Sequence, residues 1–228
     1  MNKCWFWILL FFSLSAFGQN LQVHYDFGKD RNFITSTLES FTPDKFGATF
    51  WFVDIDYNSS SNSASMAYWE IARYINLPFL KKYNILSPLS ATVQYNDGLD
   101  LNDAFGNVWL AGISYPIDLK VVTVATDVLY RKAENQSANF QLTFVWYKSF
   151  LNDKISFTGF FDIWGQNNFD GDEDRTDSQI VFMTEPQLWV KLTDYLSIGG
   201  ELEISRNFIF AAGDKIQIMP TLGLRWDF

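Results

Sequence analysis

His24 is the only histidine of this 228-residue sequence, and histidine is the side chain that acid–base catalysis uses most often. Two positions further on lies Asp26, so a strand would carry both side chains on one face. No serine occupies a Gly-x-Ser-x-Gly sequence, and the sequence has no glycine-rich phosphate-binding loop. We therefore expect no enzyme and assign His24 a hydrogen-bonding role, although a lipid hydrolase that uses His24 stays open as a hypothesis.

A second candidate for chemistry is the acidic stretch 170–174, which reads Asp-Gly-Asp-Glu-Asp. Its carboxylates begin with the one, three and five spacing of a calcium-binding loop. Such a loop also needs glycine at its sixth position and glutamate at its twelfth, and this sequence has Arg175 and Val181 there. The stretch is interpreted as a solvated loop, and we expect no metal and no cofactor.

The elements that must position any site are strands, because residues 21–228 alternate between apolar and polar types in segments of roughly ten residues. Twelve segments are predicted, and Asn, Asp, Gly, Ser and Pro lie between them. They cover 21–28, 33–41, 47–57, 66–76, 87–96, 107–116, 119–130, 138–149, 154–165, 179–191, 196–208 and 216–228.

The connections between these segments alternate in length. Short connections cover 42–45, 118–119, 151–153 and 193–195, with 77–86 as a long exception, and mostly longer polar connections cover 58–65, 97–106, 132–137 and 166–178. Barrels of the outer membrane have tight periplasmic turns and longer outer loops. The pattern predicts an all-β, twelve-stranded, antiparallel up-and-down transmembrane β-barrel whose N and C termini are periplasmic.

Composition excludes three other classes of protein. Aromatic residues make up 18% of the chain, which is far from the composition of disordered proteins. The mean hydropathy of −0.05 is too low for a bundle of membrane-spanning helices. The formal net charge of −9 argues against nucleic acid as a partner, because phosphate binding needs clustered Lys and Arg.

Residues 1–18 have the pattern of a secretory signal peptide, with Lys3 before an apolar run and small residues near Gly18. The alternative is an N-terminal membrane anchor, but the run is shorter than the roughly 20 residues that a span requires. The only cysteine, Cys4, lies in this segment, so we expect no disulfide in the mature chain. Residues 19–228 are then the barrel, located in the outer membrane of a Gram-negative bacterium.

A soluble β-sandwich or lipocalin-like barrel would also alternate, and two features, the end of the chain and the carboxylates of the second face, favour the membrane barrel over it. The chain ends on Trp226-Asp227-Phe228, which looks like the signal that the barrel-insertion machinery reads. Aromatic residues near strand ends would form the girdles that contact outer-membrane lipid. Carboxylates also occupy the second face of most strands, which suits a wet lumen: Asp26, Glu39, Asp54, Asp56, Glu70, Asp127, Asp162, Glu185, Glu201 and Glu203.

The same second face also carries large aromatic side chains. Charged groups there can simply pair across the lumen, and aromatic groups can simply fill space. Stacking surfaces beside carboxylates and amides would instead suit a flat ring in a narrow channel. The candidate lumen residues are Phe50, Phe52, Asp54, Tyr68, Glu70, Phe160, Asp162, Trp164, Glu185, Gln187, Trp189 and Arg225.

Four short motifs resemble the Tsx-like family of nucleoside-specific outer-membrane channels. They are FGATFWFVDI at 46–55, YWEI at 68–71, GFFD at 159–162 and EPQL at 185–188. The resemblance implies a monomeric twelve-stranded barrel whose narrow lumen passes nucleosides. By position, it implies a lumen role for Phe50, Phe52, Asp54, Glu70 and Glu185.

These patterns together predict an outer-membrane channel for passive, substrate-selective diffusion of small solutes, such as nucleosides. The alternative is a closed structural or receptor barrel that acts through its outer loops. Ion conductance would separate the two hypotheses, because only the channel has a continuous aqueous path.

Overall fold

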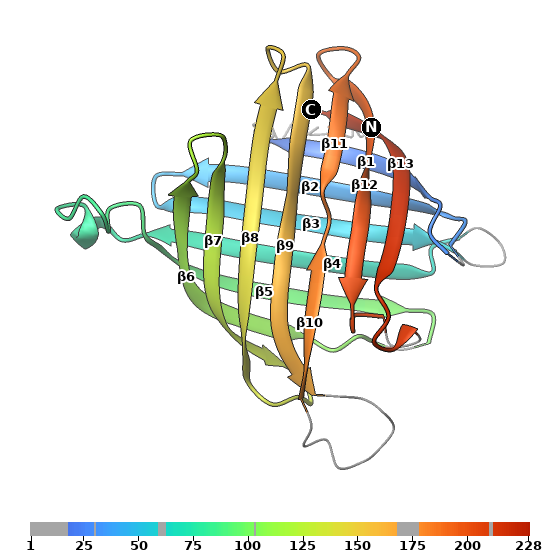
Figure 1. The fold of residues 1–228 in the computed structure, drawn as a ribbon, viewed down its shortest axis with the longest axis horizontal. Coiled ribbons are helices and arrows are strands. Elements are labelled where there is room, and N and C mark those ends of the chain that lie inside the picture. The colour runs from blue at the N-terminus through green and yellow to red at the C-terminus, as the bar shows by residue number, and fades with distance from the viewer. Residues whose placement is uncertain (1–17, 30, 59–62, 103, 168–177, 210–211) are drawn as a thin grey trace, which may run out of the picture.

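The computed structural model describes residues 18–29, 31–58, 63–102, 104–167, 178–209 and 212–228, and it shows one antiparallel sheet that closes on itself (Figure 1). The predicted signal peptide, apart from Gly18, and the stretch 170–174 lie outside the described residues. The strands are β1 (Gln19–Asp26), β2 (Ile34–Asp44), β3 (Gly47–Tyr57), β4 (Met66–Asn76), β5 (Ser90–Asp100), β6 (Val108–Asp118), β7 (Thr123–Ala133), β8 (Asn139–Phe150), β9 (Ile155–Asn167), β10 (Ser178–Thr184), β11 (Gln187–Lys191), β12 (Leu196–Arg206) and β13 (Gln217–Asp227), with a short 3₁₀ helix, η1 (Pro78–Leu80).

Each strand pairs with its neighbours in the chain, and β13 pairs with β1 to close the ring. β10 and β11 form a single wall strand, because both pair with β9 and β12 without a change of register. Pro186 interrupts this strand, since proline has no N–H to donate. The Glu185 N–H still donates to the Phe160 carbonyl at 3.2 Å, and the Leu202 N–H to the Pro186 carbonyl at 3.0 Å. The prediction of a twelve-stranded antiparallel barrel is confirmed.

Most strand boundaries differ from the predicted ones by one to three residues, and two of the shifts have a clear cause. The strand predicted at 87–96 lies at 90–100, because Leu89 is still part of a turn in which its N–H donates to the Leu86 carbonyl. The strand predicted at 119–130 lies at 123–133, because the Leu119 N–H donates to the Val122 carbonyl and Lys120 has φ of 67°. These turns delay the start of each strand.

The two ends of the barrel differ. At the termini end, which holds the first residues of β1 and the last of β13, four connections have two to four residues, and only 77–89 is longer. At the loop end, the connections are 27–33, 58–65, 101–107, 134–138, 168–177 and 207–216. Figure 1 shows β1 beside β13, and at this end Asn20 pairs with Asp227. That the termini end is periplasmic stays a prediction.

The outer face of the sheet is apolar and the inner face is polar, which is the reverse of a water-soluble barrel. On β13 the outward side chains Ile218, Leu222 and Trp226 are each more than half exposed. On β1 the inward side chains are Asn20, Gln22, His24 and Asp26, and all four are buried. In the described part of the chain, no helix is both long enough and apolar enough to cross a membrane.

The alternation of residues 66–76 places Arg73 on the lipid-facing side unless a bulge shifts the register after Glu70, and β4 has no such shift. Its pairing with β3 and β5 runs without interruption, so Arg73 points outward. The guanidinium binds both carboxylate oxygens of Asp44, at 2.6 and 3.0 Å, and donates to the Thr49 hydroxyl at 3.0 Å. The ion pair lies near the termini end, where an arginine can reach the lipid head groups.

Gly159 on β9 lies where the wall is interrupted, and its φ of 151° belongs to the region that favours glycine. An added Cβ would lie 2.5 Å from the Glu185 carbonyl oxygen and 2.9 Å from the Pro186 Cα. We expect Gly159→Ala to lower the free energy of unfolding by about 1–3 kcal/mol, measured by urea titration of refolded protein.

The matched control for Gly159→Ala is Gly213→Ala. Gly213 also has positive φ, at 59°, but a Cβ added there would have nothing within 4 Å. If both substitutions cost the same, the close approach at Gly159 has no energetic effect.

Candidate functional site

The candidate site is the barrel lumen, and the strand register places all twelve predicted residues on its inner face. For example, Phe52 is opposite Glu70, Trp189 is opposite Ser156, and Arg225 is opposite Gln22. Both side chains of each pair face inward. Their roles toward a solute stay predictions. The full set is Phe50, Phe52 and Asp54 on β3, Tyr68 and Glu70 on β4, Phe160, Asp162 and Trp164 on β9, Glu185 between β10 and β11, Gln187 and Trp189 on β11, and Arg225 on β13.

Three of these side chains form an aromatic track along one wall. The ring centroids of Phe50 and Phe52 lie 6.0 Å apart, and those of Phe52 and Tyr68 also lie 6.0 Å apart. All three residues lie on the inner face of the barrel and retain some solvent exposure. Such a track offers successive stacking surfaces to a flat solute.

Carboxylates from the opposite wall face this track. Glu185 interacts electrostatically with Glu201 and Glu203 on β12 and, across the lumen, with Asp54 and Glu70. Asp162 on β9 interacts in the same way with Glu70. We call Asp54, Glu70, Asp162, Glu185 and Glu201 the central acidic cluster, since electrostatic interactions connect them across walls that are not adjacent.

Neutral side chains donate hydrogen bonds to several of these carboxyl groups. Glu70 accepts hydrogen bonds from the Tyr68 hydroxyl at 2.5 Å and from the Asn96 amide at 2.8 Å. Glu201 accepts one from the Gln187 amide at 3.0 Å, and Asp54 accepts one from the Thr37 hydroxyl at 2.6 Å. Asp162 Oδ1 has no hydrogen-bond partner among the described residues.

Arg131 on β7 interacts electrostatically with Glu70 and Asp162. Among the described residues of the barrel wall, it is the one arginine whose charge reaches the cluster. Its guanidinium also lies 5.4 Å from the centre of a Trp164 ring. One arginine therefore lies beside five carboxylates in the middle of the lumen. No group of three or more His, Cys, Asp or Glu in the described ranges is arranged to hold a metal ion.

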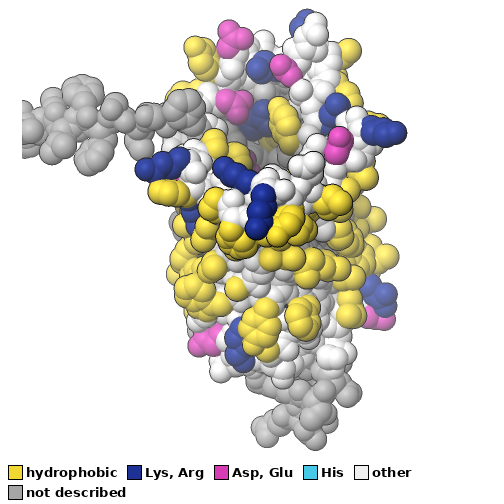
Figure 2. Space-filling model, turned by 90° about the vertical axis from the view of Figure 1, so that its left-hand side faces the viewer, with side chains coloured by type: hydrophobic (Ala, Val, Ile, Leu, Met, Phe, Trp, Pro, Cys, Tyr) yellow, Lys and Arg dark blue, Asp and Glu magenta, His cyan; other side chains and the backbone are white. Residues whose placement is uncertain are grey.

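At the termini end the lumen opens into a cavity of about 210 Å³. Trp189 lies at its inner limit: its side chain is 1% exposed, and the Arg225 guanidinium lies 5.2 Å from the centre of its ring. Lys154, Lys191, Asp194 and Asp227 also line this cavity. Figure 2 shows the molecule hollowed near this end, with Lys, Arg, Asp and Glu side chains around the recess and a hydrophobic belt below it.

His24 belongs to a chain of hydrogen bonds along the inner face of β1. Its Nε2 lies 2.9 Å from Gln22 Oε1, and its Nδ1 lies 2.9 Å from the Thr221 hydroxyl. Gln22 Nε2 donates to Asn20 Oδ1, and Asn20 Nδ2 donates to Glu39. Both imidazole nitrogens of His24 are therefore engaged within the protein, and the ring packs edge-on against Trp189 at 5.5 Å.

Sequence reasoning missed Arg31, which lies in the 27–33 connection yet reaches into the lumen. Its Nη1 lies 2.9 Å from Asp26 and 3.2 Å from Glu203, so it fastens this connection to β12. Burial opposes the charged guanidinium, but Glu203 and Asp26 outweigh this effect and raise the pKa of Arg31. The sequence carried no signal for this contact, because a loop residue has no periodicity to place it.

Tyr74 on β4 was also missed, although the alternation of this strand places it inward. Its hydroxyl donates to Asp127 Oδ2 at 3.0 Å, and the Gln94 amide donates to the same oxygen at 3.0 Å. Asp127 is 1% exposed, so these bonds hold a carboxylate that water does not reach.

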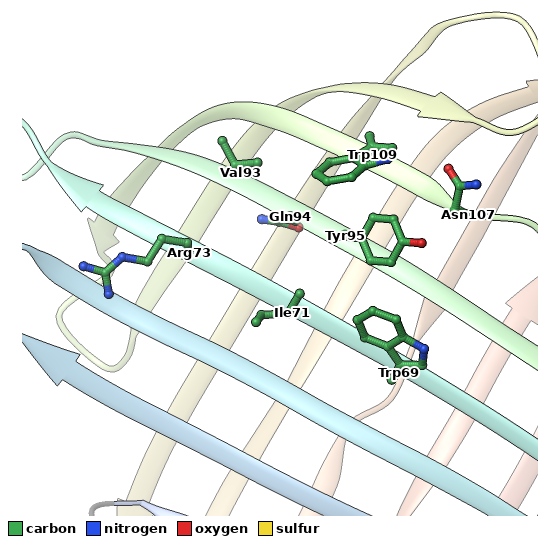
Figure 3. A pocket seen from close by; sticks show the side chains of 8 residues that line it. All are labelled: Trp69, Ile71, Arg73, Val93, Gln94, Tyr95, Asn107 and Trp109. Carbon is green, nitrogen blue, oxygen red and sulfur yellow. The ribbon is translucent and has the colours of Figure 1, made fainter.

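A larger cavity, of about 460 Å³, lies on the outer surface of the barrel and is not part of the lumen. Figure 3 shows Trp69, Tyr95 and Trp109 grouped over β4, β5 and β6, with Arg73 further along β4. The centroid of the Tyr95 ring lies 5.0 Å from the ring centroid of Trp69 and 4.7 Å from that of Trp109. Because it opens outward between lipid-facing side chains, this groove is not a candidate site for a solute.

A closed antiparallel barrel with an apolar outer face and a polar lumen defines the chain as a transmembrane β-barrel of the outer-membrane type. The chain belongs to the family described as "Domain of unknown function (DUF5020)", which matches residues 18–228. A comparison with curated protein sequences gives no match.

Among solved structures, the chain is similar to one titled "NanC porin structure in rhombohedral crystal form", at 9% identity and a TM-score of 0.57. That likeness covers 92% of this chain and 100% of the other. The chain is also similar to one titled "KdgM porin", at 10% identity and a TM-score of 0.50, over 92% of this chain and 98% of the other. At these identities the likeness establishes the fold.

Proposed function

We propose that the protein is a channel in the outer membrane for the passive, selective diffusion of small solutes, and that nucleosides or similar ring-bearing solutes are its substrates. The observation that carries the proposal is the aromatic track of Phe50, Phe52 and Tyr68 opposite carboxylates and amides inside a barrel. The rings would stack on a base while the polar wall binds the sugar hydroxyls, weakly enough for release. The likeness to structures titled as porins and the resemblance to Tsx-like channels support it.

The proposal includes three further expectations. The chain works as a monomer in the outer membrane after removal of its signal peptide, with its termini in the periplasm. Assembly uses the barrel-insertion machinery through the strand that ends on Phe228. It is not an enzyme, and an absence of phospholipid hydrolysis by the refolded protein would support this, whereas hydrolysis that is lost in His24→Ala would contradict it.

Conductance in planar bilayers tests the channel. We expect refolded protein to give discrete small conductance steps that nucleosides reduce and that sugars and amino acids leave unchanged. Replacing both Phe50 and Phe52 with leucine keeps an apolar wall but removes the stacking faces, so we expect it to raise the nucleoside concentration for half block about tenfold.

The matched control for this double variant is Phe144→Leu with Phe161→Leu. These two rings also form a pair, with centroids 6.1 Å apart, but they lie on the outward face of β8 and β9. Equal loss of block in both variants would contradict the stacking role. Block by sugars and nucleosides alike would contradict nucleoside selectivity while leaving the channel in place.

One observation favours a second candidate, a closed barrel that acts through its loops. Trp189, Leu110 and Leu129 all point inward and are 1% exposed or less, so parts of the lumen are filled with side chains. A barrel closed in this way would show neither conductance nor solute flux, and that result would replace the channel with this alternative.

A further inference from the structure

The connection 77–89, between β4 and β5, is unlike the others at the termini end. It has the sequence LPFLKKYNILSPL, and Figure 1 shows it projecting sideways from the barrel beyond the β2–β3 turn. Backbone hydrogen bonds within the segment, such as Tyr83 N–H to the Leu80 carbonyl, keep it compact. The Tyr115 hydroxyl on β6 donates to the Ile85 carbonyl at 2.8 Å and fixes it to the barrel.

Although it is compact, this segment leaves large apolar side chains uncovered. Ile85 is 78% exposed, Phe79 is 66% exposed, and Tyr83 and Leu86 are also exposed. Folding alone gives no reason to display them, since a turn of this kind can be built from polar residues. A contiguous exposed apolar patch of this kind marks a surface that another phase or molecule covers.

Basic residues surround the apolar side chains. Lys81 and Lys82 lie within the segment, which contains no acidic residue, and the ammonium of Lys82 lies 4.9 Å from the centre of the Tyr83 ring. The neighbouring β2–β3 turn repeats the arrangement, with the Lys45 ammonium 4.7 Å from the centre of the Phe46 ring. Asp44, the last residue of β2, is already paired with Arg73, so this part of the rim is positive on a chain with a net charge of −9.

We infer that the segment 77–89 is an interfacial anchor that lies in the head-group layer at the termini end and binds anionic phospholipid. Its apolar side chains continue the lipid-facing surface of the barrel beyond the ends of β4 and β5. Its two lysines lie where lipid phosphates are, and amphipathic segments that are basic on the polar side bind membrane surfaces in this way. Apolar burial and charge attraction therefore act on the same element.

Fluorescence quenching tests this inference in the full chain. In a Cys4→Ser background, Ile85→Cys carries an environment-sensitive dye, and Asn152→Cys, on the short β8–β9 turn at the same end, is the control. The protein is reconstituted in phosphatidylcholine vesicles with and without phosphatidylglycerol. We expect a lipid-borne quencher to act about threefold more strongly on the dye at 85 than at 152, and aqueous iodide to show the reverse.

A second variant tests the contribution of the lysine charges to lipid binding. Lys81→Gln with Lys82→Gln should reduce quenching from lipid in vesicles that contain phosphatidylglycerol and change little in pure phosphatidylcholine. Equal iodide access at 85 and 152 in both vesicles would overturn the inference. Shielding that persists in detergent and rises with protein concentration would also overturn it, in favour of a second copy as the occupant. If Ile85→Cys does not refold, Phe79→Cys replaces it.

Discussion

Replacing Trp189 with alanine should increase the single-channel conductance about twofold or more, because the indole is the largest fully buried side chain in the described lumen. It lies between His24 and Arg225 at the inner limit of the cavity at the termini end. Alanine removes the ring and joins that cavity to the space around the central acidic cluster. Conductance in symmetric salt solution measures the change directly.

Trp226→Ala is the control for this substitution, because the same side chain is removed from the outward face of β13 at the same end of the barrel. Trp226 is 53% exposed and meets lipid, so its loss should leave the conductance unchanged. If Trp189→Ala also leaves it unchanged, the constriction lies elsewhere. A further result would be a wild-type protein that is closed and a variant that conducts, which would identify Trp189 as the plug of a closed barrel.

The second large effect concerns ion selectivity, which we expect to favour cations strongly. Five carboxylates of the central acidic cluster face one another from opposite walls, and Arg131 is the arginine beside them. In a narrow lumen, these carboxylates raise the local cation concentration where they are ionised. The reversal potential in a potassium chloride gradient should therefore give a cation-to-anion permeability ratio of about five or more at low salt.

Glu185→Gln combined with Glu201→Gln should reduce that ratio to about two. Both substitutions keep the shape of the side chain and one acceptor oxygen, such as the one that Gln187 binds at Glu201, so the barrel should keep its thermal stability. Glu134→Gln is the control, because Glu134 is an exposed loop carboxylate that binds Asn107. Anion preference in the unmodified protein, or an equal effect of both variants, would contradict the role of the cluster.

The two-residue period of the sequence was enough to predict the barrel. In each strand, alternate side chains face inward, so one inward residue is enough to identify the others. Asp54 and Glu70 were assigned to the lumen from their own strands, and the register places their side chains on the inner face. What alternation cannot supply is the distance across the lumen. That Glu185 faces Asp54 and Glu70 depends on how the sheet curves, and no local pattern of residues encodes it.

Connections carry the other information that the sequence could not provide. Arg31 was not predicted to enter the lumen, and its contacts with Asp26 and Glu203 depend on the path of the 27–33 connection. The division of one wall strand into β10 and β11 could have been foreseen from Pro186, because proline cannot complete the ladder. The outward position of Arg73 needs no bulge, because Asp44 at the end of β2 is its partner.

The pairing of β13 with β1 has a consequence for how the chain reaches its membrane. Asn20, which is made early, finds its partner Asp227 only about 200 residues later. Until then both β1 and β12 present unpaired backbone groups, which a lipid environment penalises by several kcal/mol each. Insertion is therefore expected to wait for the final strand, and a chain that lacks 217–228 should be degraded before it reaches the membrane.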